Sequence, residues 1–148
     1  MTQQRIDYYN VAPEALDIIG KLDKYTVSTG LDRKLRELIR LRASQINGCP
    51  LCMYMHTTDV LKMGETEERT YCISAWEECE FYTEAEKVAL ELTEHVTLIP
   101  TKRVPDQLYQ RVRNHYDEKQ YVDLVLIINQ INTWNRIAIA MGQTETEK

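Results

Sequence analysis

The sequence has few of the residues that interrupt regular structure. Among its 148 residues are only five glycines and four prolines. Both are typical of turns and low-complexity segments, so their scarcity argues against a fold made mostly of loops. A content of 43% apolar and 28% charged residues is that of a globular protein. The length is that of one domain, and we expect it to span residues 1–148 with a core from about residue 5 to 142.

Long apolar segments and an excess of positive charge are also missing. The longest unbroken aliphatic run, Leu124 to Ile128, is far too short to cross a bilayer. The first ten residues, MTQQRIDYYN, lack the apolar core of a secretory signal peptide. A net charge of −5 gives the chain no bulk attraction for nucleic-acid phosphates or anionic lipid. The sequence therefore predicts a cytoplasmic protein with neither nucleic-acid nor membrane partners.

Apolar residues recur with helical spacing along the whole chain, and no strand-like alternation interrupts them. Helix ends are indicated by Asn47-Gly48, by a capping box from Thr83 to Glu86, and by Gly142. These signals predict helices over 13–25, 31–47 and 50–63, from 66 to about 76, from 83 to before Pro100, from Pro105 onward, and over about 119–141. We therefore predict an all-α, single-domain bundle of about six to seven helices.

The last predicted helix is apolar on nearly all sides, yet polar residues interrupt it. These are Asn129, Gln130, Asn132, Asn135 and Arg136. They are typical of a central bundle helix whose polar side chains find partners, and a subunit interface would cover the excess apolar surface equally well.

The pattern Cys49-Pro50-Leu51-Cys52, followed by His56, carries the candidate chemistry. With Pro50 as the first helical residue, Cys52 lies in the first turn, where the helix dipole and free N–H groups lower the pKa of a thiol. Cys49, at the cap, is close enough for a disulfide. His56 lies one turn beyond Cys52 on the same face, where an imidazole could accept the thiol proton. The sequence therefore predicts a dithiol with its own base.

Two other interpretations of this segment remain open. The cysteines could be inert core residues, because cysteine often packs like a small apolar side chain. Alternatively, Cys49, Cys52 and His56 lie at i, i+3 and i+7 and could bind zinc, with a carboxylate as the fourth ligand. Structural zinc sites usually take a second ligand pair from a separate element, and no such pair follows.

The remaining cysteines and histidines show no pattern of their own. Cys72 and Cys79 are seven residues apart with no acid or base arranged around them, and we expect buried structural thiols. His95 and His115 stand alone among charged residues and are expected to be surface or capping groups.

Glu37 is a further candidate. By default it would be a solvated residue on a charged helix, but it lies among apolar neighbours before the Asn47-Gly48 break. A chain reversal at that break would return the next helix alongside Glu37. A carboxylate beside His56 would orient the imidazole and raise its basicity.

Glu37, eleven further residues, and then Cys49-x-x-Cys52-x-x-x-His56 resemble the signature of the alkylhydroperoxidase D-like, or carboxymuconolactone decarboxylase, superfamily. The resemblance covers roughly residues 5–142. It extends to the segments LDRKLRELIRLRASQINGCPLC, SAWEECEFYTEAEKVALELTEHVT and INTWNRIAIA.

The resemblance implies an all-helical homo-oligomer, trimeric or hexameric, that acts as a thiol-dependent peroxidase or dithiol oxidoreductase. It implies that Cys52 attacks a hydroperoxide and that Cys49 resolves the sulfenic acid to a disulfide. His56 and Glu37 would form the proton relay. An external dithiol, a lipoyl group or a thioredoxin-like protein, would restore the thiols. Because sulfur carries the electrons, this mechanism requires neither a metal nor an organic cofactor.

One position departs from the family pattern. Leu51 stands where the longer peroxidases of the family have an additional relay histidine. The alternatives to a peroxidase are a decarboxylase-type lyase, which would not use a cysteine redox cycle, and a zinc-binding or redox-sensing interaction protein.

Overall fold

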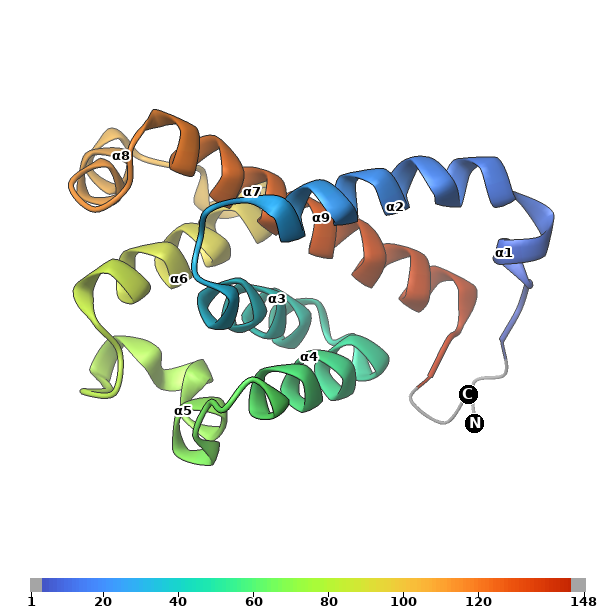
Figure 1. The fold of residues 1–148 in the computed structure, drawn as a ribbon, viewed down its shortest axis with the longest axis horizontal. Coiled ribbons are helices and arrows are strands. Elements are labelled where there is room, and N and C mark those ends of the chain that lie inside the picture. The colour runs from blue at the N-terminus through green and yellow to red at the C-terminus, as the bar shows by residue number, and fades with distance from the viewer. Residues whose placement is uncertain (1–3, 145–148) are drawn as a thin grey trace.

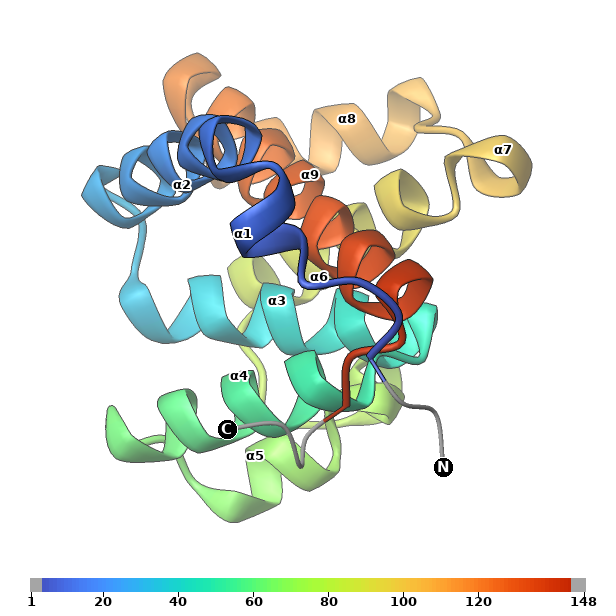
Figure 2. The same cartoon turned by 90° about the vertical axis from the view of Figure 1, so that its right-hand side faces the viewer.

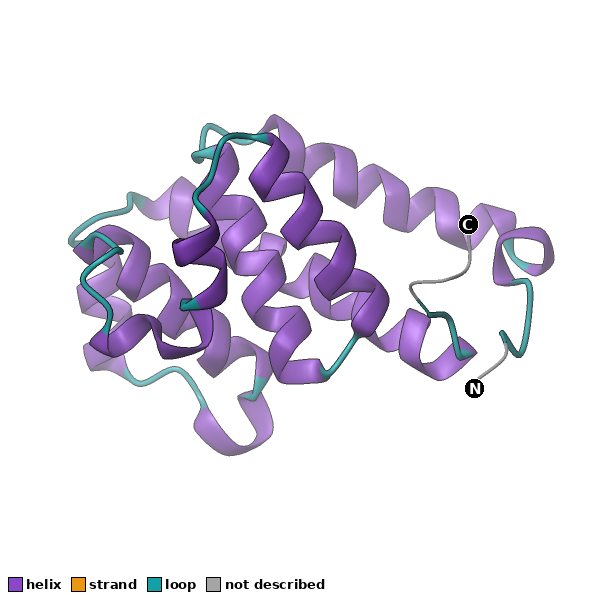
Figure 3. Ribbon diagram, turned by 90° about the horizontal axis from the view of Figure 1, so that it is seen from below, coloured by secondary structure: helices purple, strands orange, loops and turns teal. Residues whose placement is uncertain are grey.

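The computed structural model describes residues 4–144 as helices joined by short connections (Figure 1). The helices are α1 (Tyr8–Val11), α2 (Pro13–Ser28), α3 (Arg33–Asn47), α4 (Pro50–Lys62), α5 (Glu67–Tyr71), the 3-10 helix η1 (Ile73–Glu78), α6 (Glu84–Thr97), α7 (Ile99–Lys102), α8 (Asp106–Arg113) and α9 (Glu118–Met141). Residues 4–144 contain no strand (Figure 3). The prediction of an all-α fold is confirmed.

Helix α3 lies at the centre of the bundle. It packs against α4, α6 and α9, and the side chains of Leu38 and Ile39 have no exposed surface. Figure 2 shows α4 alongside α3 on one side and α9 on the other, while α2 runs over α9. Each fully buried leucine or isoleucine of this kind stabilises the fold by roughly 1.5–3 kcal/mol. The helix that carries Glu37 is therefore anchored in the core.

A tight reversal joins α3 to α4. Gly48 adopts a left-handed conformation with φ of +66°, and its N–H bonds to the last turn of α3. The N–H of Cys49 donates to the carbonyl of Ser44 at 3.0 Å, which completes the cap. Pro50 then begins α4 directly. The predicted reversal is confirmed, and it places the two helices side by side.

Two helix ends differ from the sequence prediction. Helix α2 continues to Ser28, three residues beyond the predicted end. The hydroxyls of Thr26 and Ser28 donate to the carbonyls three residues earlier in the last turn. Helix α8 begins at Asp106, with Pro105 as its cap rather than its first residue.

The helix predicted from residue 66 to about 76 is interrupted. Helix α5 ends at Tyr71, and η1 follows with a kink at Ala75, whose φ of −116° and ψ of 27° are not helical. The helices α1 and α7 were not predicted. Each has four residues, which is about one turn and too short to show a 3.6-residue periodicity.

The polar side chains of α9 that lie inside the bundle have partners. The amide of Asn132 donates to Thr97 Oγ1 at 3.0 Å, and that of Asn135 donates to Ser44 Oγ at 3.0 Å. Both asparagines are buried. This agrees with the interpretation of α9 as a central bundle helix.

Candidate active site

The two cysteines of the motif lie at the N-terminus of α4. Cys49 is the cap residue, and its sulfur accepts a hydrogen bond from the Cys52 N–H at 3.4 Å. The sulfurs are paired at 2.50 Å, with the Cα atoms 5.4 Å apart. Cys49 is fully buried, whereas Cys52 is 5% exposed. The first turn of α4 therefore presents a dithiol with one inner and one outer sulfur.

His56 and Glu37 are in direct contact across the two helices. His56 Nδ1 lies 2.7 Å from Glu37 Oε2. Glu37, on α3, is only 3% exposed. The contact joins residues nineteen positions apart, and it exists because the reversal between α3 and α4 aligns them. The proximity of these two side chains, expected if the chain reverses, is thus observed.

Glu37 is held in its ionised form. Burial alone would raise its pKa, but the hydrogen bond with His56 and the charges of Arg40, His56 and Arg36 outweigh burial and keep the pKa of Glu37 below its ordinary value. Arg40 Nη1 donates to Glu37 Oε1 at 2.9 Å, and Arg36 Nε lies 3.6 Å from the same oxygen. An ionised carboxylate only accepts hydrogen bonds, so His56 donates from Nδ1 and its Nε2 is the nitrogen left for chemistry.

Arg40 extends this network to two further helices. Its Nη2 donates to Thr26 Oγ1 at 2.8 Å and to Asp23 Oδ1 at 3.2 Å, both on α2. The Gln130 side chain of α9 donates to the same aspartate oxygen at 2.6 Å. Side chains of α2 and α9 therefore hold Arg40 and Asp23 in place, and Arg40 in turn positions Glu37.

Little in the sequence indicates this supporting network around Glu37. Arg36 and Arg40 belong to a strongly charged stretch of the sequence, yet each is only 6% exposed. Their spacing could have indicated a contact with Glu37, because both arginines lie within one helical turn of it on α3. Asp23, which binds Arg40, lies 17 residues from it in the sequence. Gln130, which binds Asp23, lies 107 residues from that aspartate and 90 from Arg40. No local pattern links these residues.

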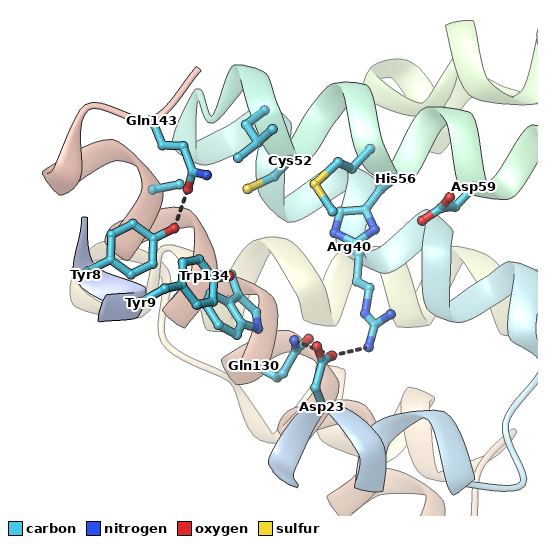
Figure 4. Close-up of a pocket in the computed structure, with 13 residues that line it drawn as sticks. Tyr8, Tyr9, Asp23, Arg40, Cys52, His56, Asp59, Gln130, Trp134 and Gln143 are labelled. Carbon is cyan, nitrogen blue, oxygen red and sulfur yellow. Dashed lines mark hydrogen bonds and ion pairs between the residues drawn. The ribbon is translucent and has the colours of Figure 1, made fainter. Parts of the chain in front are cut away.

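A cavity of about 410 Å³ opens beside the outer sulfur (Figure 4). Its lining is Tyr8, Tyr9, Asp23, Arg40, Leu51, Cys52, Met55, His56, Asp59, Gln130, Trp134, Ala138 and Gln143. One part of this wall is apolar and aromatic, and the other carries the charged network and His56. Its volume is that of a small-molecule site. Leu51, the departure from the family pattern, contributes to the apolar part.

Tyr8 and Gln143 show how the cavity is closed. The Tyr8 hydroxyl donates to the Gln143 side chain. Nearby, the Arg5 N–H donates to the Met141 carbonyl at 2.8 Å, and the Arg5 guanidinium donates to the Ala140 carbonyl at 2.8 Å. The two ends of the described chain thus bind each other and form one wall of the cavity.

Among the described residues, one group has the spacing of metal ligands. Ligand atoms of Glu37, His56 and Asp59 lie within 4.8 Å of one another. Glu37, however, already binds two arginines, and these positive charges oppose a cation at that carboxylate. The zinc set considered from the sequence fits less well, because its two cysteines are paired with each other.

The other cysteines and histidines lie away from this site. His95 Nδ1 bonds to the carbonyl of Arg103 at 2.6 Å, and His115 is exposed, as expected for capping and surface groups. The expectation that Cys72 and Cys79 are buried is wrong, because both are free and partly exposed. They flank η1, and the buried residues of that element are Ile73 and Trp76 instead.

No helix within residues 4–144 has both the length and the apolar character needed to span a membrane.

Known proteins resemble the chain along most of its length. The model of the carboxymuconolactone decarboxylase family matches residues 13–95. The uncharacterized protein YdfG of Bacillus subtilis (strain 168) is 62% identical over 145 residues, which are 98% of this chain and 99% of that protein.

Solved structures share the fold. The Agrobacterium tumefaciens protein ATU0492, of unknown function and suggested to be the antioxidant defence protein AhpD, has a TM-score of 0.91 and 37% identity, covering 94% of this chain and 95% of its own. The debrominase Bmp8 has a TM-score of 0.83 at 20% identity, covering 92% of this chain and 74% of its own. The latter similarity concerns the fold alone. The family match and the YdfG identity together show that the chain belongs to the carboxymuconolactone decarboxylase family.

Proposed function

We propose that this protein is a dithiol oxidoreductase that reduces hydroperoxides with Cys52 and Cys49. One observation carries the proposal: Cys52 and His56 line the same cavity, and His56 is bound to a buried, ionised carboxylate. A carboxylate that accepts from Nδ1 fixes the orientation and tautomer of the imidazole and leaves Nε2 to accept a proton, which is what a base that activates a thiol requires.

In the first step, His56 Nε2 takes the proton of the Cys52 thiol. The thiolate attacks the outer peroxide oxygen and the O–O bond breaks. Cys52 becomes a sulfenic acid, and the alkoxide takes the proton from His56 and leaves as an alcohol. Two electrons thus pass from sulfur to the peroxide.

In the second step, the Cys49 sulfur attacks the Cys52 sulfenic acid. A disulfide forms, and the hydroxyl leaves with the Cys49 proton as water. Cys49 needs no access to solvent for this role, which agrees with its complete burial.

In the third step, an external dithiol attacks the disulfide at Cys52, the sulfur that borders the cavity, and releases Cys49. The second thiol of the reductant then displaces Cys52, and the reductant leaves as a disulfide. We propose a lipoyl group or a thioredoxin-like protein as this dithiol. The cytoplasm is the compartment that supplies such reductants.

The decisive experiment counts free thiols and measures intact mass in reduced, metal-analysed protein before and after one equivalent of an alkyl hydroperoxide. We expect rapid loss of two thiols, with the linked peptides containing Cys49 and Cys52. Cys52→Ser should abolish this loss. Cys72→Ser, which also removes one cysteine, should leave it intact. Thiols that do not react with peroxide, in protein that contains zinc, would refute the proposal.

The other reaction classes are separated by two further measurements. A decarboxylase-type lyase would keep its activity in the Cys49→Ser/Cys52→Ser variant, because its reaction needs no thiol cycle. A redox sensor would form the disulfide but would consume no more than one equivalent of peroxide in the presence of dihydrolipoamide or reduced thioredoxin. Repeated turnover with either reductant supports the peroxidase.

A further inference from the structure

Asp59 lies beside the proposed dithiol chemistry, which does not use it. Its side chain is half-buried and lines the cavity, and a carboxylate oxygen lies within 4.8 Å of ligand atoms of both Glu37 and His56. Figure 4 shows this carboxylate turned toward His56. Within residues 4–144, no group donates a hydrogen bond to it or forms an ion pair with it. Asp59 therefore offers a negative charge to a ligand.

The other charges of the site balance one another. Arg40 forms ion pairs with Glu37 and Asp23, and Arg36 Nε lies 3.6 Å from Glu37. Two guanidinium groups thus face two carboxylates, and this network carries no net charge. Among the described residues that line the cavity, Asp59 is the carboxylate that no arginine neutralises.

Gln130 offers a second unused acceptor, from α9 on the other side of the cavity from α4 (Figure 4). The residue is only 2% exposed, and its Nε2 donates to Asp23 at 2.6 Å. Its Oε1 is buried and has no hydrogen-bond partner in the part of the chain that the structure describes. An unpaired buried acceptor is costly, so a ligand that donates a hydrogen bond to Gln130 is favoured.

The apolar part of the wall suits an organic ion. Tyr9, Leu51, Met55 and Trp134 form it. Aromatic faces bind apolar groups and also attract positive charge. A metal ion would need Glu37 as a further ligand, and two arginines already neutralise that carboxylate. An ammonium group can bind a single carboxylate through its N–H groups, so the cavity fits a small organic cation.

The spacing along α4 relates this charge to the reactive sulfur. Cys52, His56 and Asp59 follow one another along the helix, and all three line the cavity (Figure 4). Seven residues of helix span about 10 Å at about 1.5 Å per residue. A molecule bound at Asp59 therefore reaches Cys52 when its two ends are about 10 Å apart.

We propose that the cavity binds organic hydroperoxides that carry a protonated amine, with the ammonium group at Asp59 and the peroxide at Cys52. A polar hydrogen of the same molecule donates to Gln130, and its apolar part packs against Trp134. That the ligand is a hydroperoxide rests on the proposed function, whereas its positive charge follows from Asp59 and Gln130. Hydroperoxides that carry a carboxylate, such as those of free fatty acids, are disfavoured because Asp59 repels them.

The two tryptophans of the chain provide a direct measurement of binding. Trp134 lines the cavity, whereas the Trp76 indole donates to Glu94 and serves as the reference for the fold. Isotope-labelled protein in the disulfide form is titrated with phenethylamine, phenethyl alcohol or hydrocinnamate, and the indole N–H signals are followed by NMR. The three probes share a phenyl ring and differ mainly in charge. Trp134→Phe assigns the two signals.

We expect phenethylamine to shift the Trp134 signal at about tenfold lower concentration than phenethyl alcohol, and hydrocinnamate to bind most weakly. Added salt should reduce these differences. Asp59→Asn should give the amine and the alcohol equal affinity, and Asp59→Glu should keep the preference for the amine. Asp106→Asn is the matched control and should also keep it, because this aspartate lies on α8, which packs against α6 and α9.

The titration separates this proposal from the proposed function. Equal affinities for the three probes, or a preference that survives Asp59→Asn, would overturn it even if peroxide oxidises the dithiol. If Asp59→Asn displaces the Trp76 signal and is thus misfolded, the order of the probes on the wild-type protein decides. In reduced protein, phenethylamine should also compete with cumene hydroperoxide and slow the loss of thiols. If the amine binds as expected but the thiols do not react with peroxide, the proposed function fails and the amine site stands.

Discussion

At the scale of single residues, Glu37 controls the proposed reactivity of the dithiol. Its carboxylate lies 2.7 Å from His56 and is kept ionised by that hydrogen bond and by the charges of two arginines. The negative charge of Glu37 interacts favourably with the positive charge that His56 gains when it takes the proton of Cys52, so it stabilises the state that contains the thiolate.

Glu37→Gln should therefore raise the apparent pKa of Cys52 and slow its alkylation by iodoacetamide at neutral pH by about tenfold, the effect of about one pKa unit. His56→Ala should slow it further. The rates of the variants and the wild type should converge at high pH, where the thiol ionises without help. The measurement is the rate of alkylation against pH, and equal curves would remove both residues from the mechanism.

Glu91→Gln is a suitable control, because this carboxylate also pairs with an arginine, Arg111, whereas His56 bonds to Glu37. A stability measurement tests the charge of Glu37 separately. The pKa of Glu37 is lowered in the folded protein. The contribution of its charge to stability is therefore complete above the ordinary pKa of 4.5 and is lost as the pH falls through the pKa of the folded state. The stability difference between wild type and Glu37→Gln should shrink accordingly on the acid side.

The sequence predicted the residues that carry chemistry better than those that support them. Cys49, Cys52 and His56 lie within eight positions of one another, so helix geometry alone relates them. The contact with Glu37 required one further assumption, the reversal after Asn47. The contacts of Arg40 with α2 depend on how distant helices pack, and no local pattern encodes that packing.

At the scale of elements, the reversal between α3 and α4 is what assembles the site. Gly48 makes it possible by adopting φ of +66°, a conformation that costs other residues about 1–2 kcal/mol. A Cβ at this position would meet nothing within 4 Å, so its cost is conformational alone.

Gly48→Ala should lower the free energy of unfolding by about 1 kcal/mol. Gly20→Ala makes the same chemical change inside α2, again with nothing within 4 Å of the new Cβ. It should instead raise the free energy of unfolding by about 0.5–1 kcal/mol, because alanine is the better helix former. Urea denaturation measures both, and a loss of stability for the two variants alike would contradict this account of the reversal.

Helices with strong end signals were located well from the sequence. The Thr83 capping box and the left-handed Gly142 are both observed where predicted. The break at Ala75 was missed because no glycine or proline marks it. There the chain follows the core contacts of Ile73 and Trp76 rather than its own helical preference.

At the scale of the whole molecule, exposed apolar side chains surround the cavity. Tyr9 and Met55 are exposed and line it, and Tyr54 is exposed beside Met55. Val11 is exposed at the end of α1. Apolar surface gathered in this way is typical of a contact between proteins.

We propose that copies of the chain cover this surface in a homo-oligomer. Light scattering should give the mass of a trimer or hexamer, and Tyr54→Glu should shift it toward the monomer by placing a charge in the contact. Phe81→Glu changes another exposed aromatic residue, one in the connection between η1 and α6 rather than on α4, and should leave the mass unchanged. A monomeric wild-type protein would exclude this assembly.

The contact between the two ends of the described chain has a practical consequence. Tyr8 and Gln143 bind each other and both face the cavity. A peptide joined at residue 4 or at residue 144 would therefore begin within a few residues of the cavity wall. Affinity tags would compete with substrate for that space, whereas a natural fusion there would give a tethered reductant a short path to Cys52.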